Sequence, residues 1–142
     1  EYRSSSLKRT TNPAVILSAQ LRLESGTPAD VKARMDQFRA KRKRTQPPGA
    51  STGSVFKNPP GDYAGRLIEA AGLKGTRVGG VEVSRIHANF FVNHQNATAS
   101  NYLELIQIVR SKVEHLFGIY LELEIELIGD WSGINYSGAK VS

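Results

Sequence analysis

Two segments of the chain alternate hydrophobic and polar residues with the period of two that is typical of a strand. Residues 14–24 place aliphatic side chains at the odd positions, with mostly polar residues between them. Residues 119–128 alternate more strictly, which puts Glu122, Glu124 and Glu126 on one common face. We therefore predict a half-buried strand over 14–24 and a second strand over 119–128.

Helical spacing first becomes evident after these opening residues. Thr27 followed by Pro28 supplies an N-cap hydroxyl and a first-turn proline for a helix. Val31, Met35 and Phe38 follow at i, i+4 and i+7, and we expect them to form the buried stripe of this helix. Its many basic residues then face mainly solvent.

Two further helices are predicted downstream, over 64–71 and over about 100–117. Apolar residues recur at helical spacing in both, and each is followed by a glycine, Gly72 or Gly118, that can end a helix in the left-handed conformation. The longer helix is the best defined in the chain. Asn101, with a glutamate three residues later, resembles a capping box at its start.

The remaining segments complete an α+β order of elements. Prolines and glycines at 47–53 predict a loop, whereas 75–92 favours loops and short strands, ending in a strand at 89–93. The simplest arrangement is one small mixed or antiparallel sheet with helices packed on one face. Residues 131–142 show no periodicity, and we expect a loosely ordered tail there.

Composition bounds the class of protein. The 142 residues suffice for one domain, and 39 % hydrophobic with 23 % charged residues is typical of a chain with a packed core. The absence of cysteine excludes disulfides, thiolate nucleophiles and cysteine-ligated metals. No apolar run approaches the roughly 18 residues that cross a bilayer, so we expect no membrane partner and a cytoplasmic location. Glu1 opens the chain without methionine, which suggests part of a longer protein.

The formal net charge of +6 raises the question of an anionic partner. The densest basic run is Arg39–Arg44, at the end of the first predicted helix. Such a run is commonly a solvated helix end that complements the helix dipole. It also suits nucleic acid, although no aromatic residue is interleaved to stack on bases. A basic α+β nucleic-acid-binding module is therefore kept as the alternative function.

Candidate chemistry is concentrated in one loop. The three histidines are too scattered for a metal-ligand spacing, and we expect no metal site. Residues 53–60 are different, because the Ser54 hydroxyl, the Lys57 ammonium and the Asn58 carboxamide follow the flexible Gly53 and precede two prolines. From the residues alone, this segment is either a site or an ordinary loop.

Five stretches of the chain form a more specific set than any single motif. They are Tyr2-Arg3-Ser4-Ser5, Gly53-Ser54-Val55-Phe56-Lys57-Asn58-Pro59, Ala64–Gly75, Val83–Phe90 and Leu121–Gly129. In content and order, this set resembles the flavin-dependent UDP-N-acetylenolpyruvoylglucosamine reductases, also called UDP-N-acetylmuramate dehydrogenases, of bacterial cell-wall synthesis. The matching stretches cover most of the chain.

The resemblance implies a division into parts. Residues 1–24 would be the end of the FAD-binding domain, most of which lies upstream as a partner in the same protein. Residues 25–50 would be a connecting helix and loop, 51–130 the C-terminal substrate-binding domain, and 131–142 a tail. The short stretch before the Gly-Ser motif further resembles the second type of this family, which lacks an extra tyrosine-bearing loop.

The resemblance also implies a reaction and its residues. In that family NADPH reduces FAD, and the flavin passes hydride to the enolpyruvyl group of a UDP-sugar. Ser54 would protonate the resulting enolate-like intermediate, with Arg3 and Glu124 completing the acid site. Gly53, Lys57 and Asn58 would bind the substrate. This fragment alone is expected to be inactive.

Physical chemistry is consistent with these roles. An arginine fork suits a substrate carboxylate, and a nearby cation such as Lys57 can assist a serine hydroxyl, which is intrinsically a weak acid. A carboxyl group in a water-poor pocket can stay protonated. The family often has proline before the late glutamate and arginine two positions after it, where this chain has Leu123 and Glu126. The spacing to Gly129 favours Glu124, with Glu122 or Glu126 as the alternative.

Overall fold

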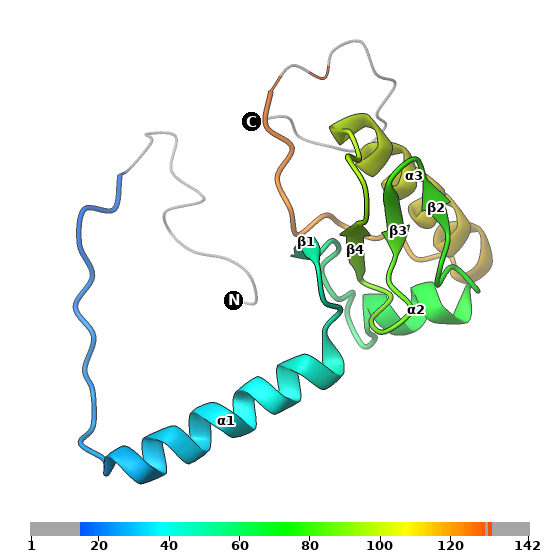
Figure 1. Cartoon of the computed structure of the whole chain (residues 1–142). Helices are drawn as coiled ribbons and strands as arrows, with labels where there is room; N and C mark the ends of the chain where they lie inside the picture. Colours follow the sequence, from blue (N-terminus) through cyan, green and yellow to red (C-terminus); the bar gives the residue numbers. More distant parts are fainter. Residues whose placement is uncertain (1–14, 130, 132–142) are drawn as a thin grey trace. The chain divides into compact units, whose positions relative to one another are not determined.

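The computed structural model describes residues 15–129 and residue 131 (Figure 1). Its contacts divide the chain into two compact units, Glu1–Met35 and Asp36–Ser142, with the boundary inside helix α1. None of the helices within the described residues is both long and apolar enough to cross a membrane.

The strand predicted over 14–24 is wrong for residues 15–24, which the structure describes. They form no strand, and all of them are exposed, Leu17 to 91 %. The alternation predicts which face of a strand would be buried, but a strand also needs a neighbour that pairs with its backbone. The described part of the chain supplies no such neighbour here.

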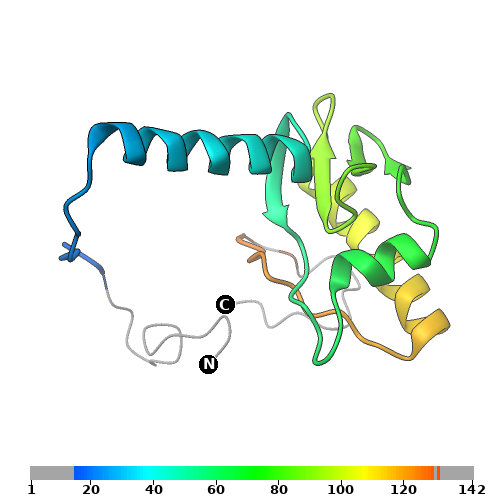
Figure 2. The same ribbon diagram turned by 90° about the horizontal axis from the view of Figure 1, so that it is seen from below.

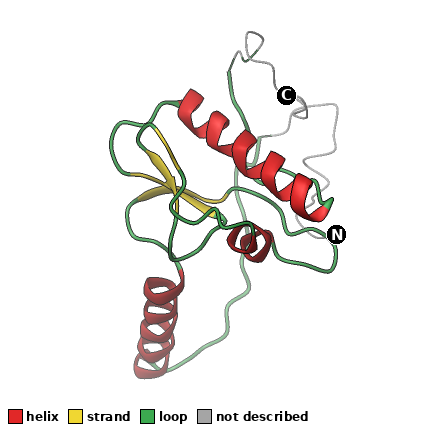
Figure 3. Ribbon diagram, turned by 90° about the vertical axis from the view of Figure 1, so that its right-hand side faces the viewer, coloured by secondary structure: helices red, strands yellow, loops and turns green. Residues whose placement is uncertain are grey.

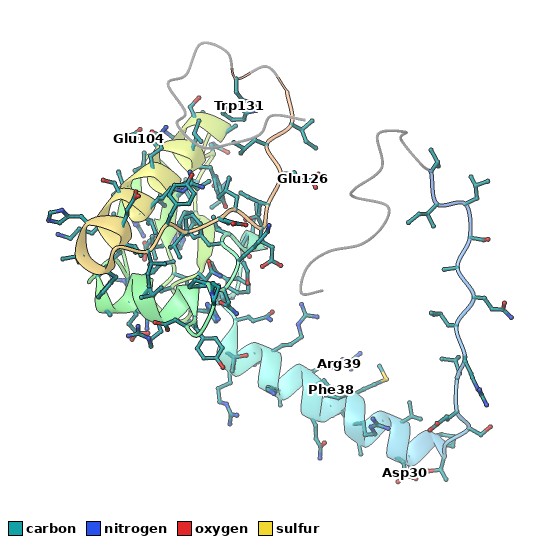
Figure 4. All side chains as sticks on the ribbon, turned by 180° about the vertical axis from the view of Figure 1, so that it is seen from behind. Asp30, Phe38, Arg39, Glu104, Glu126 and Trp131 are labelled. Atoms are coloured by element: carbon teal, nitrogen blue, oxygen red, sulfur yellow. The ribbon has the colours of Figure 1, made fainter. Side chains whose placement is uncertain are left out.

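Helix α1 covers Pro28–Thr45, as predicted. The Thr27 hydroxyl accepts a hydrogen bond from the Asp30 backbone N–H at 3.2 Å, so Thr27 is the expected cap. The predicted buried stripe is wrong, because α1 buries no residue. Phe38, labelled on α1 in Figure 4, is 60 % exposed. Spacing alone shows which residues share a face and not whether a partner covers it.

The sheet of the second unit is entirely antiparallel, with the strand order β1-β4-β3-β2. Its strands are β1 (Ala50–Ser54), β2 (Arg77–Val78), β3 (Val81–Val83) and β4 (Phe90–Asn93). Strand β1 replaces part of the loop predicted over 47–53. It tolerates the prolines before it because it is an edge strand, and its register shifts before Ser54, where Gly53 has φ +79°.

Two helices supply the other half of the core. Helix α3 (Ala99–Phe117) packs against β2 and β3, and helix α2 (Ala64–Ala70) packs against α3. Figure 3 shows both helices beside the sheet, and the α+β prediction is confirmed. The largest fully buried side chains come from α2, α3, β4 and the segments next to them: Phe56, Leu67, Ile68, Phe91, Leu103, Leu105, Ile106 and Leu121.

The ends of α3 follow local signals. The capping box is present, but it is built by Thr98 and Asn101, with Thr98 and not Asn101 as the N-cap. The expected pairing of Asn101 with Glu104 is therefore wrong by three residues. Gly118 ends the helix with φ +65°, as predicted.

The strand predicted over 119–128 is also wrong, although one part of it pairs. Leu123 forms an isolated antiparallel bridge with Phe56, and no longer ladder develops. Figure 2 shows this segment, in orange, passing beside the end of β1. The partner chain bends at Val55, and two prolines, which have no backbone N–H to donate, follow Asn58. Pairing therefore stops after one bridge.

A buried arginine fixes the start of this segment. The Arg110 Nε donates a hydrogen bond to the Leu121 carbonyl at 3.0 Å, and its guanidinium carbon lies 4.6 Å from the centroid of the Tyr120 ring. Arg110 is only 6 % exposed. Helix α3 therefore holds the chain that leads from Gly118 to Glu124 by a charge-assisted hydrogen bond and a cation–π contact.

Replacing this arginine should destabilise the chain. Arg110→Met leaves the buried Leu121 carbonyl without its donor, and we expect the free energy of unfolding to fall by about 1–3 kcal/mol. Urea denaturation followed by circular dichroism measures it. Lys112→Met removes the same charge from an exposed site on α3 and should change stability by less than about 0.5 kcal/mol. Equal losses of stability in both variants would show that Arg110 does not hold the segment after Gly118.

Candidate active site

A pocket of about 430 Å³ lies between the end of β1, the start of α2 and the turn before β4. Its polar lining residues include Ser54, Asn58, Arg66, Glu69, His87 and Asn89. A hydroxyl, two carboxamides, a guanidinium, a carboxylate and an imidazole thus converge on one concave surface. Such a set can orient a polar ligand and move a proton. Two of the residues predicted from the sequence, Ser54 and Asn58, line it.

The segment that carries Ser54 is held by Asn89, a residue that is 3 % exposed. The Asn89 backbone carbonyl accepts a hydrogen bond from Val55 N–H at 2.9 Å. Its side-chain Oδ1 accepts from Phe56 N–H at 2.9 Å, and its Nδ2 donates to the Phe56 carbonyl at 2.8 Å. Ser54 is therefore presented at the pocket by a fixed backbone.

The segment that carries Glu124 runs antiparallel to this backbone. Glu124 N–H donates to the Val55 carbonyl at 2.9 Å, and Lys57 N–H donates to the Glu122 carbonyl at 2.8 Å. The two chains on which the predicted Ser54 and Glu124 stand are thus hydrogen-bonded to each other. The backbone of Glu124 lies opposite Val55, the residue next to Ser54.

The three late glutamates have different surroundings. The Glu122 carboxylate lies 3.1 Å from the Lys57 Nζ, and both side chains are substantially exposed. Glu124 is half-buried beside the Ser54 chain, whereas Glu126 is exposed beyond the bridge, as Figure 4 shows. Position therefore distinguishes Glu124 from its two neighbours, which the alternation alone did not.

Asn58 and Gly53 have structural tasks in addition to those predicted. The Asn58 Oδ1 accepts a hydrogen bond from Ala64 N–H at 3.1 Å, which satisfies a backbone donor in the first turn of α2. Gly53 has φ +79°, a conformation that favours glycine, immediately before Ser54. Asn58 therefore lines the pocket, whereas Gly53 shapes the backbone that leads into it. The predicted Arg3 lies outside the described residues.

The rim of the pocket carries an ion pair that the sequence analysis did not single out. Arg66 holds the Asp62 carboxylate with two nitrogens, the Nε at 2.6 Å from Oδ1 and the second, Nη2, on Oδ2. Together with a hydrogen bond from Tyr63 N–H, this fork lowers the pKa of Asp62 to about 2. Asp62 and Arg66 are spaced as i, i+4 across the start of α2.

His87 is the second pocket residue that sequence reasoning missed as part of a site. Burial lowers the pKa of its imidazole. Its Nδ1 accepts a hydrogen bond from Asn89 N–H at 3.2 Å, which leaves the proton of the neutral ring on Nε2. A Cβ at Gly65 would lie 3.2 Å from the ring, so the absent side chain makes room for it. Spacing gave no signal for this histidine.

Two other expectations concern the remaining charged groups. Within residues 15–129 and 131, no group of three or more His, Cys, Asp or Glu side chains is arranged to hold a metal ion. The basic run ends α1, with Arg42, Lys43 and Arg44 in the last turn. There the cations complement the negative end of the helix dipole.

Known proteins match the part of the chain that contains the pocket. Residues 44–128 match the family model described as the C-terminal domain of UDP-N-acetylenolpyruvoylglucosamine reductase. A relative of that name from Chloroflexus aurantiacus is 51 % identical over 130 residues, which is 89 % of this chain and 44 % of the relative. One from Rubrobacter xylanophilus is 49 % identical over 116 residues, 82 % of this chain and 39 % of the relative.

A solved structure gives the same result. The crystal structure of UDP-N-acetylenolpyruvylglucosamine reductase from Thermus caldophilus matches with a TM-score of 0.63 and 42 % sequence identity. The match covers 75 % of this chain and 38 % of that one. The chain therefore spans less than half the length of the relatives that it matches.

The ion pair at the rim gives a prediction about pH. Because the folded pKa of Asp62 lies below its ordinary value of 3.8, its contribution to stability is complete above about pH 4 and is lost as the pH falls through about 2. Arg66→Gln removes the largest cause of the shift, so the carboxyl midpoint should rise toward 3.8 in a carbon-detected NMR titration. Arg39→Gln, on α1, is the control and should leave it near 2. An unchanged midpoint in Arg66→Gln would show that the fork does not set this pKa.

Proposed function

We propose that this chain, which belongs to the family of UDP-N-acetylenolpyruvoylglucosamine reductases, is the substrate-binding part of an enzyme that makes UDP-N-acetylmuramate for peptidoglycan. The reaction is the reduction of UDP-N-acetylglucosamine enolpyruvate with NADPH. The observation that supports it most directly is the pairing of the Ser54 chain with the Glu124 chain beside a polar pocket. We place this enzyme in the cytoplasm.

The division of the chain follows from this proposal. Residues 1–24 end the FAD-binding domain, 25–50 connect, 51–130 form the substrate-binding domain, and 131–142 are a tail. The enzyme is of the second type of the family, as the short stretch before Gly53 indicates. The start of the sheet at Ala50 supports a substrate-binding domain that begins near residue 51.

FAD belongs mainly to the upstream part of the protein. The described residues that would border its domain, 15–24, are all exposed and form no wall that encloses a flavin. These residues by themselves do not fit FAD, and we assign no step through the flavin to them. FAD and NADPH supply the hydride in the whole enzyme, and this chain supplies the proton and much of the substrate site.

The proton is the contribution of Ser54. Hydride addition to one carbon of the enolpyruvyl double bond leaves negative charge that the neighbouring carboxylate shares. The Ser54 O–H bond then breaks, a C–H bond forms at the second carbon, and the serine oxygen regains a proton from solvent. Glu124, in its half-buried position, polarises the intermediate as a second acid, and Arg3 binds the substrate carboxylate through its planar fork.

Substrate binding involves the residues around Ser54. Gly53 lets the backbone approach the ligand closely, because no Cβ stands at that position. The Asn58 carboxamide donates from its nitrogen while its oxygen caps α2. Lys57 exchanges its exposed partner Glu122 for the diphosphate, since a surface ion pair is weak and its side chains are mobile enough to part.

Substituting the proton donor should separate the two halves of the reaction. In the full-length protein, Ser54→Ala should lower kcat by about 10²–10⁴-fold, while reduction of the flavin by NADPH keeps its rate. Stopped-flow absorbance measures both steps. Ser51→Ala, an exposed serine on the same strand, is the matched control and should keep wild-type kcat. Full activity in Ser54→Ala would refute the assignment.

The late glutamates provide an independent test. Glu124→Gln keeps the side-chain volume but replaces the carboxyl group by an amide, so kcat should fall by roughly 10²-fold with little change in KM. Glu126→Gln, on the exposed part of the same segment, should stay near wild type. Steady-state kinetics in the full-length protein decide between them. A large loss in Glu126→Gln alone would move the acid role to that residue.

A further inference from the structure

The structure assigns Asn89 a positioning role in the reaction, and this inference rests on the function proposed above. Asn89 does not carry the proton. Its side chain bonds both polar groups of Phe56, and those bonds set where Ser54 and Glu124 stand relative to each other.

The backbone ladder between β1 and β4 ends at Asn89. Ser54 pairs with Phe90, and Val55 N–H still reaches the Asn89 carbonyl at 2.9 Å. One residue further the chain turns through Ala88 and Asn89, and Phe90 N–H bonds back to the His87 carbonyl at 2.9 Å. The Asn89 backbone is already occupied, because its carbonyl accepts from Val55 N–H and its N–H donates to the His87 Nδ1. The Asn89 carboxamide pairs with Phe56 instead, because it offers one acceptor and one donor as a peptide group does.

The hydrogen bonds between Asn89 and Phe56 also affect the position of Glu124. Because Asn89 binds the N–H and the carbonyl of Phe56, the Val55 carbonyl and the Lys57 N–H face residues 122–124. The Val55 carbonyl then receives Glu124 N–H, and Lys57 N–H reaches the Glu122 carbonyl. Asn89 therefore connects to Ser54 along one chain and to Glu124 across a bridge. Loosening it should misplace both acids together.

The surroundings of position 89 require a buried side chain with one hydrogen-bond acceptor and one donor. It is 3 % exposed, its backbone N–H donates to the His87 Nδ1, and both of its side-chain polar atoms are bonded. Aspartate has the same size and keeps an acceptor for Phe56 N–H, but it places a carboxylate oxygen against the Phe56 carbonyl. Alanine removes both bonds. The two variants therefore test the donor and the whole amide separately.

Asn93 is a matched control on the same strand. Its Oδ1 accepts a hydrogen bond from Ala97 N–H at 3.1 Å, so Asn93→Ala also removes a bond from a side-chain amide to the backbone. It lies at the other end of β4, where it pairs with Ala50 and Val81, four residues along β1 from Ser54. A role that is only structural predicts similar kinetic behaviour in Asn89→Ala and Asn93→Ala.

The test uses the full-length protein, below the unfolding temperature of every variant. Asn89→Ala and Asn89→Asp should lower kcat about 10²-fold with KM changed little, because small misplacements of reacting groups have effects of that size. The solvent deuterium isotope effect on kcat should increase, and flavin reduction by NADPH should keep its rate. Asn93→Ala should keep kcat and the isotope effect. Retention of kcat in Asn89→Ala would overturn the inference.

Two further results keep the test decisive. If the Asn89 variants do not fold, amide hydrogen exchange in the wild-type protein replaces them, and the Phe56 N–H must be protected as strongly as Val55 N–H. Exchange of Phe56 N–H at the rate of an exposed amide would overturn the inference. A wild-type protein without substrate-dependent turnover would refute the proposed function itself, which is a different outcome from a normal enzyme that is insensitive to Asn89.

Discussion

The backbone around Phe56 is the junction on which the rest of the second unit depends. The Phe56 ring is fully buried and meets Phe91 edge-on, with centroids 6.1 Å apart. The peptide groups on either side of it bond to Asn89 on one side and to the late segment on the other. The buried Phe56 ring thus anchors a short stretch whose backbone groups position the segments that carry Ser54 and Glu124. Burial of the ring stabilises the core, and the hydrogen bonds give the site its geometry.

Charge in this molecule is largely compensated where the fold is compact. Glu82 on β3 is 5 % exposed and has two cationic neighbours, Arg77, which forms an ion pair with it, and Arg85 at 3.4 Å; the His94 Nε2 also lies 3.5 Å from its carboxylate. A buried carboxylate needs such partners. Arg66 is likewise occupied by Asp62. Much of the net charge of +6 therefore concerns the end of α1 and not the pocket, and positive charge alone is a poor guide to the site.

Local signals in the sequence predicted the helices, their glycine ends and the fold class, because helix periodicity depends on neighbours three and four residues away. The strands at 14–24 and 119–128 failed for a non-local reason, since a strand forms only where another chain pairs with it. The pocket is likewise non-local: Ser54 and Asn89 lie 35 positions apart in the chain, and nothing in the spacing of His87 or Asn89 indicates that they line it. The resemblance to a family supplied Ser54 and Glu124, and the hydrogen bonds supplied the reason why their chains adjoin.

We propose that a solvent-exchangeable hydroxyl of this chain delivers the proton that completes the reduction. The most direct measurement is turnover of the full-length protein in deuterium oxide with unlabelled NADPH, followed by NMR analysis of the product. We expect deuterium from solvent at the carbon that is protonated, the one bonded to the carboxylate. A product without solvent deuterium at this carbon would show that no solvent-exchangeable hydroxyl delivers the proton.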